Sequence, residues 1–268
     1  MRHEMKSVAA GLALAAALSA TSGRADDFSD QGRTIFQKNQ HAVVTVMTVL
    51  KSKFTVAGKE GQSSESRDEV TGTIVAPSGL TVLSLSRFDP GQLMQKMAGE
   101  GEQRFKMESE LTDVELLLDD GTEVPAEVVL RDKDLDLAFI RPKAKLAKPM
   151  AALDLGESGK ADVLDEVIAL NRLGNAAGRA YSASVERISA VIRKPRLFYI
   201  PDSNTTNTTL GSPAFTLDGH ALGIFVLRAL KDRSGGSFPR MQGGNLTPVI
   251  LPAEDIVKAV KQVPAAGQ

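Results

Sequence analysis

The chain has 268 residues, of which 42% are hydrophobic, and its formal net charge is -1. This length suits one or two ordinary hydrophobic cores, and a near-neutral charge argues against nucleic acid as the main partner. Cysteine is absent, which excludes disulfides, thiolate nucleophiles and sulfur-ligated metals, and we predict neither a cofactor nor a metal.

Residues 1–25 have the pattern of a cleaved signal peptide. Arg2 and Lys6 accompany an apolar run over 7–20, and small residues end at Ala25, before Asp26. The apolar run is about 14 residues, shorter than the roughly 20 that span a bilayer. We therefore expect a periplasmic or secreted protein without stable membrane insertion, in which residues 26–40 form an N-terminal segment.

Short runs rich in Val, Ile, Leu and Thr fill most of the remaining chain. They are separated by turn signals at Pro77–Gly79, Asp119–Gly121, Leu173–Asn175 and Asp218–Gly219. Strands at roughly 8–12-residue spacing are typical of a β-sandwich or β-barrel. The polar run Gly58–Glu69 has the composition of a hairpin loop. The predicted fold class is therefore all-β.

Two segments favour helices instead. An insert at about 90–112 places Leu93, Met94, Met97 and Phe105 on one apolar helical face. The segment 252–263 begins with proline and carries two acidic residues in its first turn, where the helix dipole favours negative charge. We predict a helix in each.

The run NTTLGSPAF, Asn207–Phe215, resembles the nucleophile loop of trypsin-like serine proteases, most closely the HtrA/Deg branch. Thr71–Phe88 resembles the segment that ends at the general-base histidine of this family, and Val114–Pro142 resembles the hairpin that ends at its triad carboxylate. Asp165–Arg193 and Thr247–Val263 extend the similarity. The resemblance implies two antiparallel β-barrels, 41–145 and 146–251, followed by a C-terminal helix and tail, 252–268.

The same register predicts a degenerate catalytic triad. Asp136 takes the place of the carboxylate, but Ser86 stands where the histidine belongs and Leu210 where the serine nucleophile belongs. The oxyanion hole would use the main-chain N–H groups of Thr208 and Leu210. A leucine cannot attack a carbonyl, and no group at Ser86 titrates near neutrality. We expect the serines at 86 and 84 to donate hydrogen bonds to Asp136 instead.

Other residues leave an alternative open. A rearranged site would need a new nucleophile, such as Ser84, Ser86 or Ser212, and one of the histidines. His41 and His220 both read as solvated loop residues. The rival interpretation is therefore a serine-type endopeptidase with a non-standard active site.

The peptide groove of the family does not depend on the triad. By resemblance, Phe225, Val226, Leu227 and Arg228 would offer main-chain groups to an extended peptide, as an added β-strand. The residues after the last helix, PAAGQ, predict no PDZ module, and a homo-oligomer is compatible with the family. The sequence thus predicts an exported HtrA-like pseudoprotease that binds a peptide or protein; a structural component of an envelope assembly is a further alternative.

Overall fold

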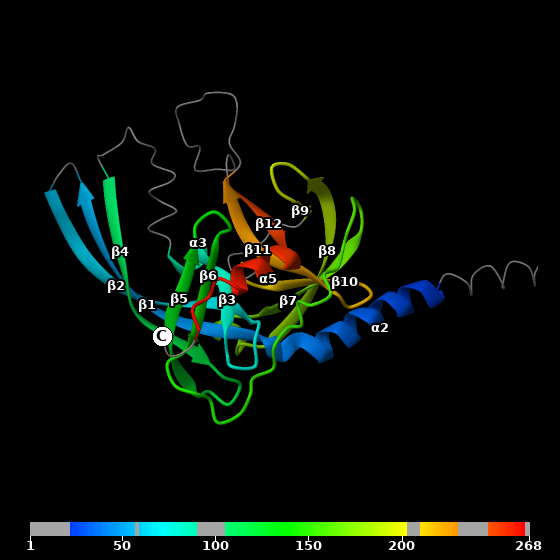
Figure 1. Cartoon of the computed structure of the whole chain (residues 1–268), viewed down its shortest axis with the longest axis horizontal. Helices are drawn as coiled ribbons and strands as arrows, with labels where there is room; N and C mark the ends of the chain where they lie inside the picture. The colour runs from blue at the N-terminus through cyan, green and yellow to red at the C-terminus, as the bar shows by residue number, and fades with distance from the viewer. Residues whose placement is uncertain (1–21, 57–58, 90–104, 203–209, 230–245, 266–268) are drawn as a thin grey trace, which may run out of the picture.

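The computed structural model describes residues 22–56, 59–89, 105–202, 210–229 and 246–265 (Figure 1). Within these ranges the chain forms two closed barrels of six antiparallel strands each, which confirms the predicted two-barrel all-β fold. No helix in these ranges has the length and apolar character needed to cross a bilayer.

The first barrel closes in the order β1-β2-β3-β6-β5-β4. Its interior is apolar, with Val46, Leu116 and Ile140 fully buried. The turn signals at Pro77–Gly79 and Asp119–Gly121 connect its strands, and Gly79 and Gly121 adopt the positive φ that glycine tolerates. Its strands are β1 (Val43–Val56), β2 (Lys59–Ile74), β3 (Thr81–Ser84), β4 (Phe105–Leu117), β5 (Glu123–Asp132) and β6 (Leu137–Pro142).

The second barrel closes in the order β10-β11-β12-β9-β8-β7. Its interior buries Val167, Leu222, Phe225 and Ile250. Its strands are β7 (Glu166–Arg172), β8 (Tyr181–Ile192), β9 (Phe198–Pro201), β10 (Pro213–Thr216), β11 (Ala221–Ala229) and β12 (Leu246–Pro252). Short helical elements lie at the edges: η1 (Gln40–Ala42), α3 (Leu85–Phe88) and η2 (Asn175–Ala177).

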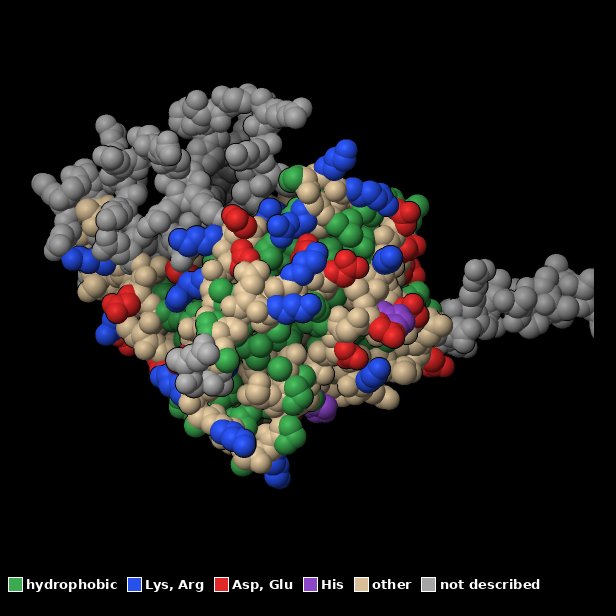
Figure 2. Space-filling model, viewed as in Figure 1, with side chains coloured by type: hydrophobic (Ala, Val, Ile, Leu, Met, Phe, Trp, Pro, Cys, Tyr) green, Lys and Arg blue, Asp and Glu red, His purple; other side chains and the backbone are tan. Residues whose placement is uncertain are grey.

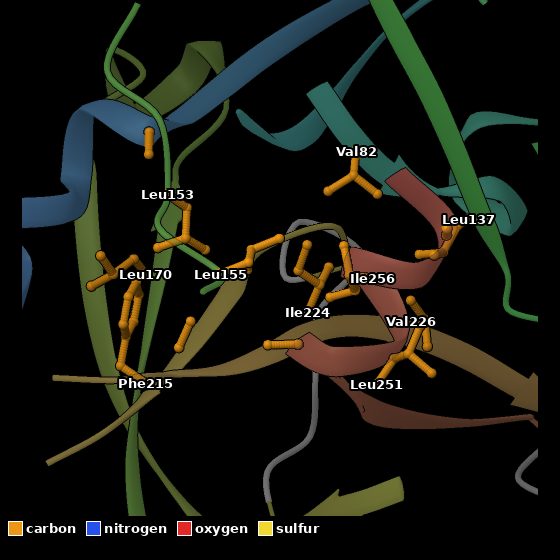
Figure 3. Close-up of a cluster of buried hydrophobic side chains, with 14 of the residues drawn as sticks. Val82, Leu137, Leu153, Leu155, Leu170, Phe215, Ile224, Val226, Leu251 and Ile256 are labelled. Carbon is orange, nitrogen blue, oxygen red and sulfur yellow. The ribbon is translucent and has the colours of Figure 1, made fainter. Parts of the chain in front are cut away.

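A shared core joins the two barrels. Figure 3 shows Val82 and Leu137 of the first barrel together with Ile224, Val226 and Leu251 of the second. Helix α5 (Ala253–Val260) adds its buried apolar face to this cluster, with Pro252 at its N-cap as the sequence predicts. Because one apolar cluster continues across both barrels, their relative position is fixed by packing.

The structure corrects two sequence predictions in the first barrel. Residues 105–112, expected to be helical, belong to β4, which pairs with β1 from Val56↔Phe105 to Thr45↔Leu117. Phe105, Met107 and Leu111 are separated by even numbers of residues, which fits the two-residue alternation of a strand and does not place them on one helical face. The supposed loop at 58–69 forms β2 from Lys59 onward, because its partner β1 supplies a full register. The rest of the expected helix, 90–104, lies outside the described residues.

Helix α2 (Ser22–Asn39) is not among the helices predicted from the sequence. Its Ile35 is buried in the shared core, and Phe28 and Phe36 pack against that core. The spacing of these residues, at i, i+7 and i+8, is that of one helical face and could have indicated the helix.

Candidate functional site: a buried carboxylate at the barrel interface

Asp136 lies in the turn between β5 and β6, immediately before β6 begins. Its φ is 60°, an unusual value for a residue with a side chain, and only 6% of it is exposed. Its carbonyl oxygen accepts a hydrogen bond from Leu85 N–H at 2.9 Å. The turn and the start of α3 therefore hold the carboxylate in a defined place at the barrel interface.

Four hydrogen bonds reach the two carboxylate oxygens. Ser84 Oγ donates to Oδ2 at 2.6 Å, and the Ser86 hydroxyl and N–H donate to Oδ1 at 2.6 and 2.7 Å. The fourth donor is the main-chain N–H of Leu227 on β11, 2.8 Å from Oδ2. The expected serine hydrogen bonds are present, and the carboxylate also ties the first barrel to the second.

The donors to Asp136 are all formally neutral. Burial raises the pKa of the Asp136 carboxyl above its ordinary value, and the hydrogen bonds from Ser84, Ser86 and Leu227 offset part of this rise. Each oxygen already accepts two hydrogen bonds, which satisfies most of its capacity. In this arrangement the carboxylate is held by serines and main chain, where triad chemistry requires it to orient an imidazole.

The segment around Leu210, the predicted nucleophile position, packs on the first barrel. Leu210 is 5% exposed. Gly211 follows it with φ +90°; its carbonyl accepts a hydrogen bond from Thr73 Oγ1 at 2.8 Å, and a Cβ there would lie only 2.1 Å from the carbonyl oxygen of Thr71. Only glycine fits this approach. Thr208, the other predicted oxyanion position, lies outside the described residues.

The candidate alternative nucleophiles all have structural hydrogen bonds. Ser212 is fully buried and donates to Asn171 Oδ1 at 3.1 Å, an oxygen that also accepts from Thr71 Oγ1. Ser84 is 1% exposed and donates to Asp136, as does the less buried Ser86. None of the three is hydrogen-bonded to a histidine within the described residues, so none shows the pairing that activates a serine.

The two histidines of the described chain lie elsewhere. His41 Nδ1 is 2.9 Å from Asp119 Oδ2, and its ring meets that of Tyr181 edge-on. His220 Nδ1 lies 3.4 Å from Glu157, in the turn between β10 and β11. His220 is partly exposed, as expected, but the expectation of a simply solvated His41 is incomplete, because this ring belongs to a polar cluster between the barrels.

Strand β11 carries the residues predicted to bind a peptide. The N–H of Phe225 donates to Ser212 and its carbonyl accepts from Gly211, while the N–H of Leu227 is used by Asp136. Val226 pairs with Val249 of β12, and strand alternation directs its main-chain groups toward that strand. Arg228 pairs with Thr247 in the same way, and its guanidinium lies over the Phe198 ring.

This corrects the expectation for the peptide edge. Phe225 is internally bonded at both its main-chain groups and fully buried, so it has nothing to offer a peptide. The alternation leaves the carbonyl of Leu227 and the groups of Ala229 on the side away from β12. A peptide that adds to β11 would therefore begin pairing at Leu227 and extend toward Ala229.

The comparisons with known proteins agree with this architecture. A family model described as a trypsin-like peptidase domain matches residues 103–224. This part of the chain, which begins within the first barrel, is thus similar to a trypsin-like peptidase domain. Among curated proteins, none matches the chain.

Solved structures place the fold beside the HtrA/Deg proteases. An HtrA-type protease, AlgW, determined with a decapeptide, superimposes with a TM-score of 0.57 at 18% identity, over 88% of this chain and 68% of that one. Deg5 superimposes with a TM-score of 0.52 at 16% identity, over 86% of this chain and 92% of that one. The chain has the fold of these proteases, as its sequence motifs predict.

Some site residues escaped sequence reasoning. The donor at Leu227 is a main-chain group, and main-chain donors leave no residue type to recognise. Asn171, which accepts from both Thr71 and Ser212, sits within a strand whose other residues are mostly apolar. A lone amide in such a strand is a signal that could have been read.

Proposed function

We propose that the protein is an exported HtrA-like pseudoprotease that binds extended peptides or unfolded protein segments without cleaving them. The observation that carries the proposal is the carboxylate of Asp136, both of whose oxygens accept hydrogen bonds from serines and main-chain N–H groups. Loss of a triad serine or histidine typically costs on the order of a millionfold in turnover.

The surroundings of Leu210 further support the absence of catalysis. The buried leucine and the main-chain bonds of Gly211 and Ser212 fill the region where the resemblance places the nucleophile. Peptide binding is supported by the likeness to an HtrA-type protease solved with a decapeptide, and by the side of β11 that remains for pairing beyond Leu227.

Export is supported by the pattern of residues 1–25. We propose cleavage before Asp26 and a periplasmic or secreted mature chain. N-terminal sequencing of protein recovered from the envelope fraction tests this: a mature terminus at Asp26 is expected, and an intact Met1 in a cytoplasmic fraction contradicts it.

A fluorophosphonate probe tests the loss of catalysis, because labelling requires an activated hydroxyl. We expect no labelling of the purified mature protein and no fragments from fluorescent casein, with trypsin as the positive control. Labelling that Ser84→Ala, Ser86→Ala or Ser212→Ala abolishes would establish the endopeptidase alternative.

Binding is tested separately on permanently unfolded, carboxymethylated lactalbumin, by fluorescence anisotropy. We expect saturable binding, and we expect the lactalbumin to be uncleaved after the measurement. If neither binding nor cleavage occurs, the result favours the alternative of a structural component with a blocked groove.

A further inference from the structure

A second groove lies away from β11, where three parts of the chain meet. The turn before β3, the connection after β6 and the segment after α5 enclose about 830 Å³. In Figure 1 these are the cyan turn, the green connection and the red C-terminal segment near the label C. The volume is within the range of small-ligand and peptide pockets.

The walls of this groove are held by specific contacts. Gly79, with φ +88°, is packed so closely that an added Cβ would lie 2.7 Å from Pro142 Cγ and 3.2 Å from Leu146 Cδ1. Met150 N–H donates to Pro77 O at 3.0 Å, and Arg141 Nη1 donates to Pro264 O at 2.9 Å. Because each wall is tied to another, the groove is preformed and would not have to open for a ligand.

The lining carries an excess of positive charge. Lys143, Lys145 and Lys148 are exposed, and none of them forms an ion pair with another described residue. The acidic residue of the lining, Glu127, is engaged by Arg141, whose Nε lies 3.1 Å from its carboxylate. Three lysines are left without a counter-charge on a chain whose net charge is -1. Such a cluster attracts anionic ligands.

The groove also has an apolar part, because Leu80, Leu146, Val260 and Val263 belong to its lining. Figure 2 shows Lys and Arg side chains next to hydrophobic side chains at the lower edge of this face. A free phosphate would neutralise the lysines but would leave the apolar lining exposed to water. A flat lipid surface would not enter a concave site. A peptide that alternates carboxylates with aliphatic side chains would match both the positive charge and the apolar lining.

The connection itself offers main-chain groups. From Ala144 to Lys148 the backbone makes no main-chain hydrogen bond to any residue in the described ranges, in contrast to Lys143 and Met150 on either side. Exposed main-chain donors and acceptors of this kind pair readily with an extended partner segment.

We propose that this groove binds an extended acidic peptide segment of a partner protein, with its carboxylates on Lys143, Lys145 and Lys148 and an aliphatic side chain against Leu146. This site shares no residue with the β11 edge, so its test does not depend on the fate of the proposed pseudoprotease function.

The test uses the full mature chain and a fluorescein-labelled dodecapeptide of alternating Glu and Leu, followed by anisotropy. We expect saturable binding that weakens with salt, and no binding of the matched Lys and Leu peptide. The triple variant Lys143→Glu, Lys145→Glu, Lys148→Glu should lose at least tenfold in affinity, and Leu146→Asp should lose a similar factor.

A matched triple variant controls for net charge. Lys38→Glu, Lys160→Glu and Lys194→Glu make the same charge change on exposed lysines outside the groove, and should leave affinity within twofold of the wild type. Circular dichroism of all variants confirms folding. Equal losses in both triple variants, absence of saturable binding, or preferential binding to phosphatidylglycerol vesicles would overturn the proposal.

Discussion

Asp136 and Asp119 belong to the first barrel, and the carboxylate of each accepts a hydrogen bond from the second barrel. The two carboxylates differ in burial and in the charge of their partners. Asp136 is buried and its donors are serines and main-chain N–H groups. Asp119 is half-exposed and meets His41 at 2.9 Å, the Arg172 guanidinium at 3.1 Å and the Tyr181 hydroxyl.

The two carboxylates thus differ in the kind of partner that they bind. A triad carboxylate needs a titratable partner, and in this chain the titratable partners cluster on Asp119 instead. Burial raises the pKa of Asp136. At Asp119 burial also opposes ionisation, but the bonds from Tyr181 and His41 and the charge of Arg172 outweigh it and lower the pKa. The two sites should therefore respond differently to mutation, salt and pH.

The largest effect is expected at Gly211, where the segment before β10 lies against the first barrel. Gly211→Ala places a Cβ 2.1 Å from the Thr71 carbonyl oxygen and forces alanine to φ +90°. Overpacking costs about 1–3 kcal/mol and the backbone conformation about 1–2 kcal/mol more. Urea unfolding should show a loss of about 4 kcal/mol.

Gly121→Ala is the matched control, because φ is +83° there but nothing lies within 4 Å of the added Cβ. It should lose only the backbone cost, about 1–2 kcal/mol. Equal losses at the two glycines would show that the contact with Thr71 is not tight.

Asp136→Ala should come next in size. It leaves the N–H groups of Leu227 and Ser86 and the Ser84 hydroxyl without their acceptor, and a buried unsatisfied donor costs about 1–3 kcal/mol. We expect a loss of about 3 kcal/mol, or a fall of about 6–12 °C in Tm for a chain of this size. Asp134→Ala, on an exposed residue of the same turn, should leave Tm nearly unchanged.

An unchanged Tm for Asp136→Ala would mean that the four hydrogen bonds only compensate for burial of the charge. The carboxylate would then have no structural reason to be at this position, and a role in an active site would become the better explanation.

The sequence was informative where a residue type decides the chemistry. The assignment of Ser86, Asp136 and Leu210 to triad positions rests on the glycines and prolines around them and stays a prediction. The serine bonds to Asp136 followed from the cost of an unpaired buried charge. The all-β class followed from short strands separated by turns at Gly79, Gly121 and Gly219, and the two barrels followed from the resemblance.

Other features could not be predicted because they depend on tertiary pairing. The polar residues of β2 from Lys59 have no strand signal of their own, and they form a strand because β1 is beside them. Phe105–Leu111 was included in a helix whose apolar face was read mainly from residues before it, and pairing with β1 makes it a strand. The cluster at Asp119 joins residues from three segments that are far apart in sequence, so no local pattern could reveal it.

A smaller loss is expected at the Asp119 cluster. Asp119→Ala removes the acceptor for Tyr181 and the counter-charge of Arg172, whose side chain is only 7% exposed. Because Asp119 itself is half-exposed, we expect a loss of about 1 kcal/mol. Arg172 keeps the Leu117 and Arg179 carbonyls as acceptors. Urea unfolding in low salt and in 1 M NaCl should show this loss shrinking with salt, since salt screens charges.

The same measurement on Asp136→Ala should show little dependence on salt, because its donors are neutral. If salt instead diminishes the effect of Asp136→Ala and leaves that of Asp119→Ala unchanged, the assignment of charged and neutral partners to the two carboxylates is wrong.

The smallest effect, and the most specific, is in the pH dependence. Asp136 has a folded pKa above its ordinary value of 3.8, so the folded state holds this proton more tightly than the unfolded state does. Its contribution to stability is full below that ordinary value and declines as the pH rises through the folded pKa. Asp119 has a folded pKa below 3.8, so its contribution is present above that value and is lost as the pH falls through the folded pKa.

The difference in free energy of unfolding between the wild type and each asparagine variant isolates the contribution of that carboxyl group. Between pH 3 and pH 7, the wild type should lose stability relative to Asp136→Asn as the pH rises, and gain it relative to Asp119→Asn. Chemical unfolding at intervals of half a pH unit resolves the two slopes. Slopes of the same sign would mean that the hydrogen bonds to Asp136 outweigh its burial and lower its pKa.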